Sequence, residues 1–134
     1  MDLDHFKSLN DSHGHAEGDQ TLVDVVEVIN SRKRQLDFVF RSGGDEFTLL
    51  ARNTSMASAL FFAEQLRSEV ESSFSGVRGG VTLSMGVAEY RLDETMEDWM
   101  RQADLCLYES KRHGRNMVWP RPENENHVVL EEGC

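Results

Sequence analysis

Two pairs of carboxylates in the sequence have a spacing that suits chemistry. Asp2 and Asp4 are two residues apart, so in an extended segment their side chains share one face. Asp45 and Glu46 directly follow a Gly-Gly pair in the stretch RSGGDEFTLL. Hard divalent cations are bound through carboxylate and carbonyl oxygens. Both pairs are therefore candidates for metal binding.

The second pair has interpretations that the residues alone leave open. In strict alternation Asp45 shares a face with Phe47, and Glu46 shares one with Thr48. One carboxylate could then bind a metal while the other accepts a proton or holds the site together. Acidic residues at the tip of a hairpin are also commonly just solvated.

Basic residues near the end of a predicted helix form a third candidate. Lys111 and Arg115 are four residues apart in SKRHGRN and straddle the helix end. Cations there complement the negative end of the helix dipole, which is by itself a sufficient reason for both. His13 and His15 could suggest zinc, but no Cys or further His is placed to complete such a site.

Apolar spacing predicts the elements that must position these residues. Apolar residues at i, i+3, i+4 and i+7 predict amphipathic helices, and strict alternation predicts strands. Helices are expected at Ala16–Arg32, from Met56 to about Val70 after a cap at Thr54 or Ser55, and at Glu94–His113. Strands are expected at Phe38–Arg41, Glu46–Ala51, Val81–Val87 and Asn116–Trp119. This order predicts an α/β (α+β) fold with a mixed, largely antiparallel sheet and helices packed on it.

Two details of the strands follow from the same patterns. Alternation of apolar residues with Thr82, Ser84 and Gly86 predicts a strand with one covered face. Gly43 and Gly44 tolerate the positive φ angles that a two-residue hairpin turn needs, so a tight hairpin is expected there.

Composition narrows the classes of function. The chain has 134 residues and a net charge of −10, which argues against general binding to nucleic acid through its phosphates. A local nucleotide site is not excluded, because it needs just a few basic residues and a metal. No run of about 18 apolar residues is present, so no membrane-spanning segment is expected. Cys106 and Cys134 do not make a disulfide framework, which predicts a reducing compartment, the cytoplasm.

Four stretches taken together resemble one family, the GGDEF domain of diguanylate cyclases. They occur in the family's order and are MDLDHFKSLNDSHGHAEGD, RSGGDEF, SMGVAEY and ADLCLYESKRHGRN. The resemblance covers almost all of residues 1–119 and implies the family's nucleotidyl-cyclase, palm-like fold. It also implies a reaction, in which two GTP molecules on the two subunits of a homodimer condense to cyclic di-GMP and release pyrophosphate. Each 3′-hydroxyl attacks the α-phosphate of the other GTP.

The resemblance implies a role for each matching residue. Asp2 and Asp45 would bind Mg²⁺ (or Mn²⁺) through their side chains, and Leu3 would do so through its backbone carbonyl. Glu46 or Asp45 would help to deprotonate the attacking hydroxyl, and Lys7 would stabilise the transition state at the phosphates. Roles in GTP binding fall to Asn10, His15 and Asp19 at the guanine, Gly43 and Gly44 beside the nucleotide, and Lys111 and Arg115 at the terminal phosphates.

A further match concerns regulation. The residues RQLD at 34–37 read R-x-x-D and end shortly before the Gly-Gly pair, a spacing that marks the inhibitory product site in the family. Arg34 and Asp37 would bind cyclic di-GMP there, and bound product could hold two domains in an unproductive orientation.

Two alternative functions stay open beside the cyclase. The first is a non-catalytic protein that binds GTP or cyclic di-GMP through Arg34 and Asp37. The second is another nucleotidyl cyclase of similar fold, which Asn10 and Asp19 disfavour because they match guanine-reading positions.

The start of the chain departs from the resemblance. Family domains begin upstream with a helix and a longer first strand, so residues 1–119 are expected to lack that helix and most of the strand. Apolar surface would be uncovered, neighbouring strands would be unpaired, and Asp2 would sit on a frayed terminus, which would put catalysis at risk. Residues 120–134 form an acidic tail that is expected to be poorly ordered.

Overall fold

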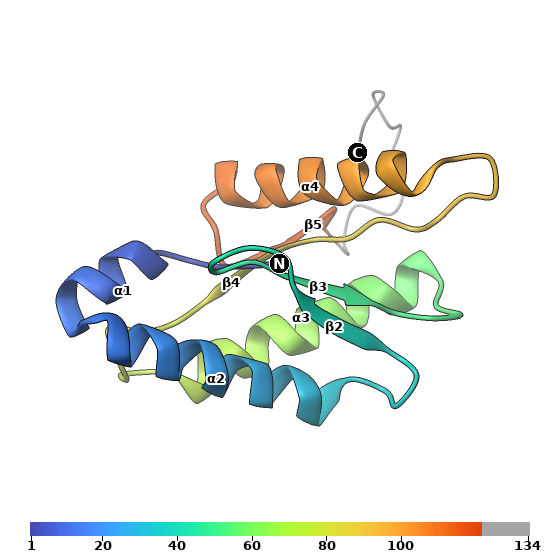
Figure 1. The fold of residues 1–134 in the computed structure, drawn as a ribbon. Helices are drawn as coiled ribbons and strands as arrows, with labels where there is room; N and C mark the ends of the chain where they lie inside the picture. The colour runs from blue at the N-terminus through green and yellow to red at the C-terminus, as the bar shows by residue number, and fades with distance from the viewer. Residues whose placement is uncertain (122–134) are drawn as a thin grey trace.

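A computed structural model describes residues 1–121 of the chain, in which short strands lie between helices (Figure 1). The elements in chain order are β1 (Asp2–Leu3), α1 (Phe6–His13), α2 (His15–Arg32), β2 (Phe38–Arg41), β3 (Phe47–Leu50), α3 (Met56–Ser73), β4 (Leu83–Gly86), α4 (Met96–Arg112) and β5 (Val118–Trp119). The mixed α/β architecture that the sequence predicts is confirmed.

The strands form two hydrogen-bonded groups that β1 connects. One has the order β1-β4-β5, with β1 antiparallel and β5 parallel to β4, and the other is the antiparallel hairpin β2-β3. Asp2 is registered opposite Ser84 on one side and bridges to Glu46 on the other. The short strand β1 therefore lies at the centre of the sheet, between the hairpin and β4.

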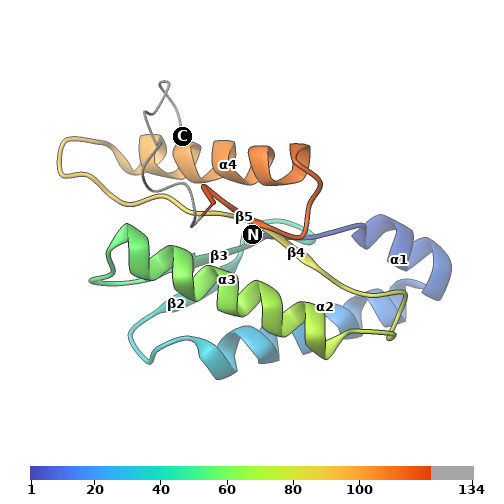
Figure 2. The ribbon, with the colours of Figure 1, turned by 180° about the vertical axis from the view of Figure 1, so that it is seen from behind.

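Helices cover both faces of the central strand β4. Figures 1 and 2 show α4 on one side of the strands and α3 with α2 on the other, and both α3 and α4 contact β4. Gly86 makes the close approach of α4 possible, since a Cβ atom at this position would lie 2.3 Å from the backbone oxygen of Ala103. The core between the layers includes Leu66, Val70 and Leu83, all fully buried.

The three predicted helices are confirmed, and one more helix was missed. α2, α3 and α4 match the predicted ranges closely, Ser55 caps α3, and Gly114 after α4 has the positive φ expected of a C′ residue. The missed helix is α1, in which Leu9 is the one buried residue. Its N-cap, His5, makes no side-chain capping bond. The two usual signals of a helix, an apolar stripe and a cap, are therefore both absent.

Two details of the predicted strands are wrong. β4 is covered on both faces, because Ser84 is as fully buried as Leu83 and donates a hydrogen bond to Asp4. The hairpin exists, but residues 42–46 connect its strands, so the turn is longer than two residues. Neither Gly43 nor Gly44 has a positive φ. Backbone bonds from Ser42 and Gly43 to the carbonyl of Glu46 close the turn instead.

An apolar groove of about 640 Å³ lies beside the start of β1. It is lined by β3, by the segment from Met85 to Tyr90, and by inward-facing residues of α3 and α4. Apolar surface is thus accessible next to β1. No helix among residues 1–121 is long and apolar enough to cross a membrane.

The expectation that Asp2 lies on a frayed terminus is wrong. The amino group of Met1 donates to the carbonyl of Phe47 at 2.8 Å, and the N–H of Phe47 donates back to Met1 at 2.9 Å. Asp2 itself is 6% exposed. The hydrogen bonds to the hairpin therefore fix the first residues of the chain in the sheet. The predicted acidic tail, 120–134, lies largely outside the described residues.

Candidate active site

Asp2 lies at the centre of the candidate site and is incompletely partnered. Its Oδ2 forms an ion pair with Nζ of Lys111, which α4 brings over β1. Its Oδ1 is buried and has no hydrogen-bond partner. Burial raises the pKa of Asp2 to about 6, and the negative charge of Asp45 contributes, although Lys111 opposes both effects.

Asp45 reaches Asp2 through the pairing of the hairpin with β1. The N–H of Leu3 donates to the carbonyl of Asp45 at 3.1 Å, and Asp2 bridges to Glu46. The negative charge of Asp45 helps to raise the pKa of Asp2, as expected for two neighbouring carboxylates. No group of three metal-binding side chains occurs among residues 1–121. A cation there would therefore take two carboxylates and add backbone carbonyl or substrate oxygens.

The side chains of Arg41 and Glu46 contact the backbone at the tip of the hairpin. Arg41 folds back and donates from Nε to the carbonyls of Gly43 and Gly44 at 3.1 and 3.0 Å. The side chain of Glu46 lies against Gly43, because a Cβ atom there would be 3.0 Å from Oε2 of Glu46. Nothing lies within 4 Å of a Cβ placed on Gly44. The backbone at Gly44 is thus open to an approaching molecule.

Asp45 and Glu46 do point to different surroundings, as strand alternation predicts. The carboxylate of Asp45 raises the pKa of Asp2, whereas Glu46 lies over Gly43 and near the Met1 ammonium. Burial lowers the pKa of that ammonium, and the charge of Glu46 is one of those that partly offset the effect of burial. The two adjacent carboxylates are therefore suited to different roles.

A second incompletely partnered atom lies between α1 and α2. Oδ1 of Asn10 is buried without a hydrogen-bond partner. It is pressed against Gly18, where a Cβ atom would be 1.7 Å away. Asp19 and His15 lie on the same helix as Gly18 and are exposed, and Lys7 is exposed on α1. The sequence motif thus places an amide, a carboxylate and a cation along one helix pair.

Asp4 does not share the chemistry of Asp2, although the two were paired in the sequence analysis. Its carboxylate accepts hydrogen bonds from Thr82, Ser84 and the backbone N–H of Asn116, at 2.7, 2.6 and 3.0 Å. It is 8% exposed. Asp4 is therefore a structural link between β1, β4 and the segment before β5. The sequence offered no signal for its partners, which are 78 to 112 residues away.

The basic pair that straddles the end of α4 is divided in the structure. Lys111 is half-buried and pairs with Asp2, so its predicted phosphate contact would require a change of partner. Arg115 is exposed on the following turn, and its side chain forms no hydrogen bond or ion pair within residues 1–121. The structure brings Lys111 to the carboxylates and leaves Arg115 at the rim.

Arg34 and Asp37 lie apart from this site, at the corner between α2 and β2. Asp37 is 4% exposed and accepts hydrogen bonds from the backbone and side chain of Arg34 and from the N–H of Arg52. Arg34 also donates to the carbonyl of Arg52 and to Thr54. Burial opposes ionisation of Asp37, but these hydrogen bonds outweigh it and lower its pKa. The pair is engaged internally.

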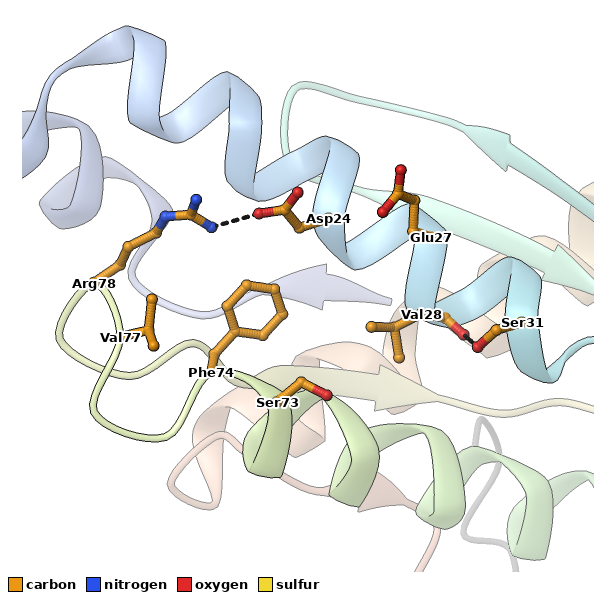
Figure 3. A pocket seen from close by; sticks show the side chains of 8 residues that line it. All are labelled: Asp24, Glu27, Val28, Ser31, Ser73, Phe74, Val77 and Arg78. Atoms are coloured by element: carbon orange, nitrogen blue, oxygen red, sulfur yellow. Dashed lines mark hydrogen bonds and ion pairs between the residues drawn. The ribbon is translucent and has the colours of Figure 1, made fainter.

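A separate hollow of about 470 Å³ lies between α2 and the end of α3 (Figure 3). It contains none of the predicted site residues. Arg78 reaches across it to Asp24 at 2.7 Å, and it also binds Glu17 at 2.9 Å. These ion pairs tie the loop after α3 to α2, so this hollow is a structural junction.

The fold and the paired carboxylates agree with one known family. Residues 1–117 match the family described as "Diguanylate cyclase, GGDEF domain". The chain therefore belongs to the GGDEF family.

Individual relatives agree with this assignment. Diguanylate cyclase A from Treponema denticola is 42% identical over 122 residues, which is 88% of this chain and 33% of that protein. Diguanylate cyclase DgcM from Escherichia coli is 40% identical over 119 residues, covering 88% of this chain and 29% of that protein. The chain thus spans about a third of the length of these curated relatives.

Solved structures show the same fold. The GGDEF domain of DgcB from Caulobacter crescentus, in complex with c-di-GMP, has a TM-score of 0.82 and 37% identity. The match covers 87% of this chain and 72% of that one. The active GGEEF domain of a diguanylate cyclase from Vibrio cholerae has a TM-score of 0.80 and 34% identity, covering 87% of this chain and 76% of that one.

Proposed function

We propose that this domain condenses two GTP molecules to cyclic di-GMP as a homodimer, with Mg²⁺ or Mn²⁺. One observation carries the proposal. Oδ1 of Asp2 and Oδ1 of Asn10 are the buried side-chain atoms of residues 1–121 that have no hydrogen-bond partner. Buried polar atoms are normally satisfied, so such exceptions need an explanation. The resemblance assigns Asp2 to metal binding and Asn10 to guanine, so a bound complex of GTP with the metal ion would provide partners for both atoms.

The residues around Asp2 fit a divalent cation. Asp2 and Asp45 would bind it through carboxylate oxygens, with the carbonyl of Leu3 as a third oxygen donor. The buried, unpartnered Oδ1 of Asp2 fits an oxygen ligand, and a cation there would offset the burial and the like charge that raise the pKa of Asp2. The bound ion would supply electrostatic stabilisation of charge on the reacting phosphate.

The chain's own residues would hold the rest of the nucleotide. Lys7 on α1 and Lys111 and Arg115 near the end of α4 would contact phosphates, and Lys111 would exchange its bond to Asp2 for one to the ligand. Asp19 would accept hydrogen bonds from N1 and N2 of guanine, and Asn10 would contact the guanine edge, with His15 nearby. Gly43 and Gly44 would let the hairpin backbone lie against the nucleotide.

Proton transfer would fall to the hairpin carboxylates. The carboxylate of Glu46 forms no hydrogen bond or ion pair within residues 1–121, so it is available to accept the proton of the 3′-hydroxyl, with Asp45 as the other candidate. A homodimer is needed because each hydroxyl attacks the GTP of the other subunit. Positioning two bound nucleotides in this way supplies much of the rate acceleration in phosphoryl transfer.

Product regulation is a separate part of the proposal. Arg34 and Asp37 would bind cyclic di-GMP, which requires Arg34 to exchange its bonds to Asp37, Arg52 and Thr54 for bonds to the ligand. Its side chain is more than half exposed, so the exchange is sterically open. Inhibition that persists in Arg34→Ala would contradict this site.

The function is tested by incubating purified protein with GTP and Mg²⁺ and measuring cyclic di-GMP and pyrophosphate. Product is expected from GTP and not from ATP. Asp45→Asn is the matched control, because it removes one charge and keeps the shape of the side chain. The test is repeated with a chain extended upstream of Met1. Absence of product from both chains would overturn the cyclase proposal, and GTP or cyclic di-GMP binding without turnover would favour a receptor.

A further inference from the structure

The turn that carries Arg115 has an unfavourable backbone. Gly114, Arg115 and Asn116 follow one another with φ angles of 116°, 64° and 47°. Positive φ suits Gly114 and is tolerated by asparagine, but it is uncommon for a residue such as Arg115. Arg115 therefore needs contacts that hold the turn in this conformation.

Asn116 makes such contacts with α3 through its side chain. Its Oδ1 accepts a hydrogen bond of 2.7 Å from Nη1 of Arg67, and its Nδ2 donates one of 2.9 Å to Oε1 of Glu71. Arg67 is itself fixed by ion pairs of 2.6 Å with both Glu64 and Glu71. Both ends of the Asn116 amide are therefore bound to a rigid helix.

Asp4 holds the same turn from the sheet. Its Oδ2 accepts the backbone N–H of Asn116 at 3.0 Å, while Thr82 and Ser84 fix the carboxylate on β4. Asp4 follows Asp2 by two residues, so one short segment anchors both the candidate metal ligand and the turn. The direction in which Arg115 leaves the backbone is thus set relative to Asp2.

Arg115 is left without a side-chain partner within the described part of the chain. Its backbone N–H donates to the carbonyl of Ser110 at 3.1 Å, so the turn holds it on both sides. We propose that Asn116, together with Asp4 and Arg67, is a positioning residue that directs Arg115 to the terminal phosphates of the bound nucleotide. This inference rests on the phosphate role of Arg115 in the proposed function.

Positioning by this turn predicts a selective loss of affinity. Asn116→Ala keeps Arg115 but removes the side-chain bonds that hold its backbone. The conformational entropy of the turn would then be lost when the ligand binds, which lowers affinity. Affinity for a non-hydrolysable GTP analogue is expected to fall about tenfold, as for a weakened charge-assisted hydrogen bond. Affinity for GMP is expected to stay within about twofold, because GMP has no terminal phosphates.

The experiment is a double-mutant cycle measured by calorimetry with Mg²⁺, using the GTP analogue and GMP. The proteins are the wild type, Asn116→Ala, Arg115→Ala and the double variant. If Asn116 acts through Arg115, the double variant binds the analogue no more weakly than Arg115→Ala does. Asn53→Ala is the matched control, because Asn53 is an exposed asparagine with a positive φ of 49° on another loop.

Three results would overturn the inference. In the first, Asn116→Ala weakens binding by its full factor in the Arg115→Ala background. In the second, it weakens GMP and the analogue equally, as a merely structural defect would. In the third, Arg115→Ala alone has no effect, which would also remove the phosphate role from the proposed function. If Asn116→Ala does not fold, Asn116→Gly takes its place, since glycine accepts the same φ and lacks the amide.

Discussion

Asp2 and Asp37 are carboxylates of almost equal solvent exposure, 6% and 4%, yet their pKa values move in opposite directions. Burial raises the pKa of Asp2 to about 6, helped by the charge of Asp45. Burial also works against ionisation of Asp37, but hydrogen bonds from Arg34 and nearby backbone outweigh it and lower the pKa.

Asp2 lies deeper in the protein than Asp37, and the partners of the two side chains also differ. Asp37 accepts four hydrogen bonds from N–H donors at the corner between α2 and β2. Asp2 has one ion pair, with Lys111, and a buried oxygen that has no partner. A buried carboxylate without donors costs stability, so a fold tolerates it where a ligand supplies the missing interaction. Burial alone therefore does not distinguish a structural carboxylate from a ligand-binding one.

Asp2→Asn is expected to have the largest effect, and on activity rather than stability. Cyclic di-GMP formation should fall about 100-fold or more. The reason is that the proposed metal ion, which stabilises charge on the phosphate in the transition state, loses a charged ligand. The free energy of unfolding should stay the same or rise, because the variant removes a buried charge whose Oδ1 has no partner, and Lys111, a third exposed, can be solvated in its place. Initial rates measure the expected loss of activity, and urea denaturation measures the free energy of unfolding. A large loss of stability with intact specific activity would contradict the contrast with Asp37.

Asp37→Ala is expected to show the reverse pattern. The free energy of unfolding should fall by about 2–3 kcal/mol, because several donors lose a buried charged acceptor. The basal rate at low product concentration should change less than about threefold, since Asp37 lies away from Asp2. Urea denaturation and initial rates are again the measurements. A rate loss as large as that of Asp2→Asn would contradict the separation of the two regions.

Asn10→Ala sharpens the comparison at the second unpartnered oxygen. If Oδ1 of Asn10 reads guanine, the KM for GTP should rise about tenfold, with a smaller effect on stability. Asn30→Ala is a suitable control, because Asn30 is exposed on the last part of α2. Equal KM values for GTP in the two variants would remove Asn10 from the guanine site.

The pH dependence of stability should separate the two carboxylates by small effects of opposite sign. In metal-free protein the folded pKa of Asp2 is above its unfolded value of about 4. Stability should therefore rise as pH falls from about 6 to 4, and Asp2→Asn should remove this rise.

Asp37 acts in the other direction, because its folded pKa is below the unfolded value. Its contribution is fully present above about pH 4 and is lost as pH falls through the folded pKa, and Asp37→Asn should flatten that loss. Urea denaturation from pH 7 to pH 3 in EDTA measures both differences. A pH profile of Asp37→Asn parallel to that of the wild type would contradict the assignment.

The sequence predicted the parts of the fold that local pattern controls. The helices α2, α3 and α4 have clear apolar stripes, and Ser55 and Gly114 mark two of their ends. The hairpin followed from two β-rich runs around two glycines. Helix α1 was missed, because one buried residue and an uncapped start give no local signal. The predicted geometry of the turn was wrong, because backbone hydrogen bonds within residues 42–46 close the loop and neither glycine has a positive φ.

The candidate site was located by motifs but explained only by tertiary contacts. By itself the sequence determined which carboxylates, amides and cations are present and, by resemblance, their family. Residue type and spacing alone could not separate Asp2 from Asp4, since both are acidic residues in one extended segment. That separation depends on Ser84 and Asn116, which meet Asp4 only once β4 and the last turn are in place. Ionisation and hydrogen bonding depend on distances between atoms, and residues far apart in the chain set those distances when the core packs.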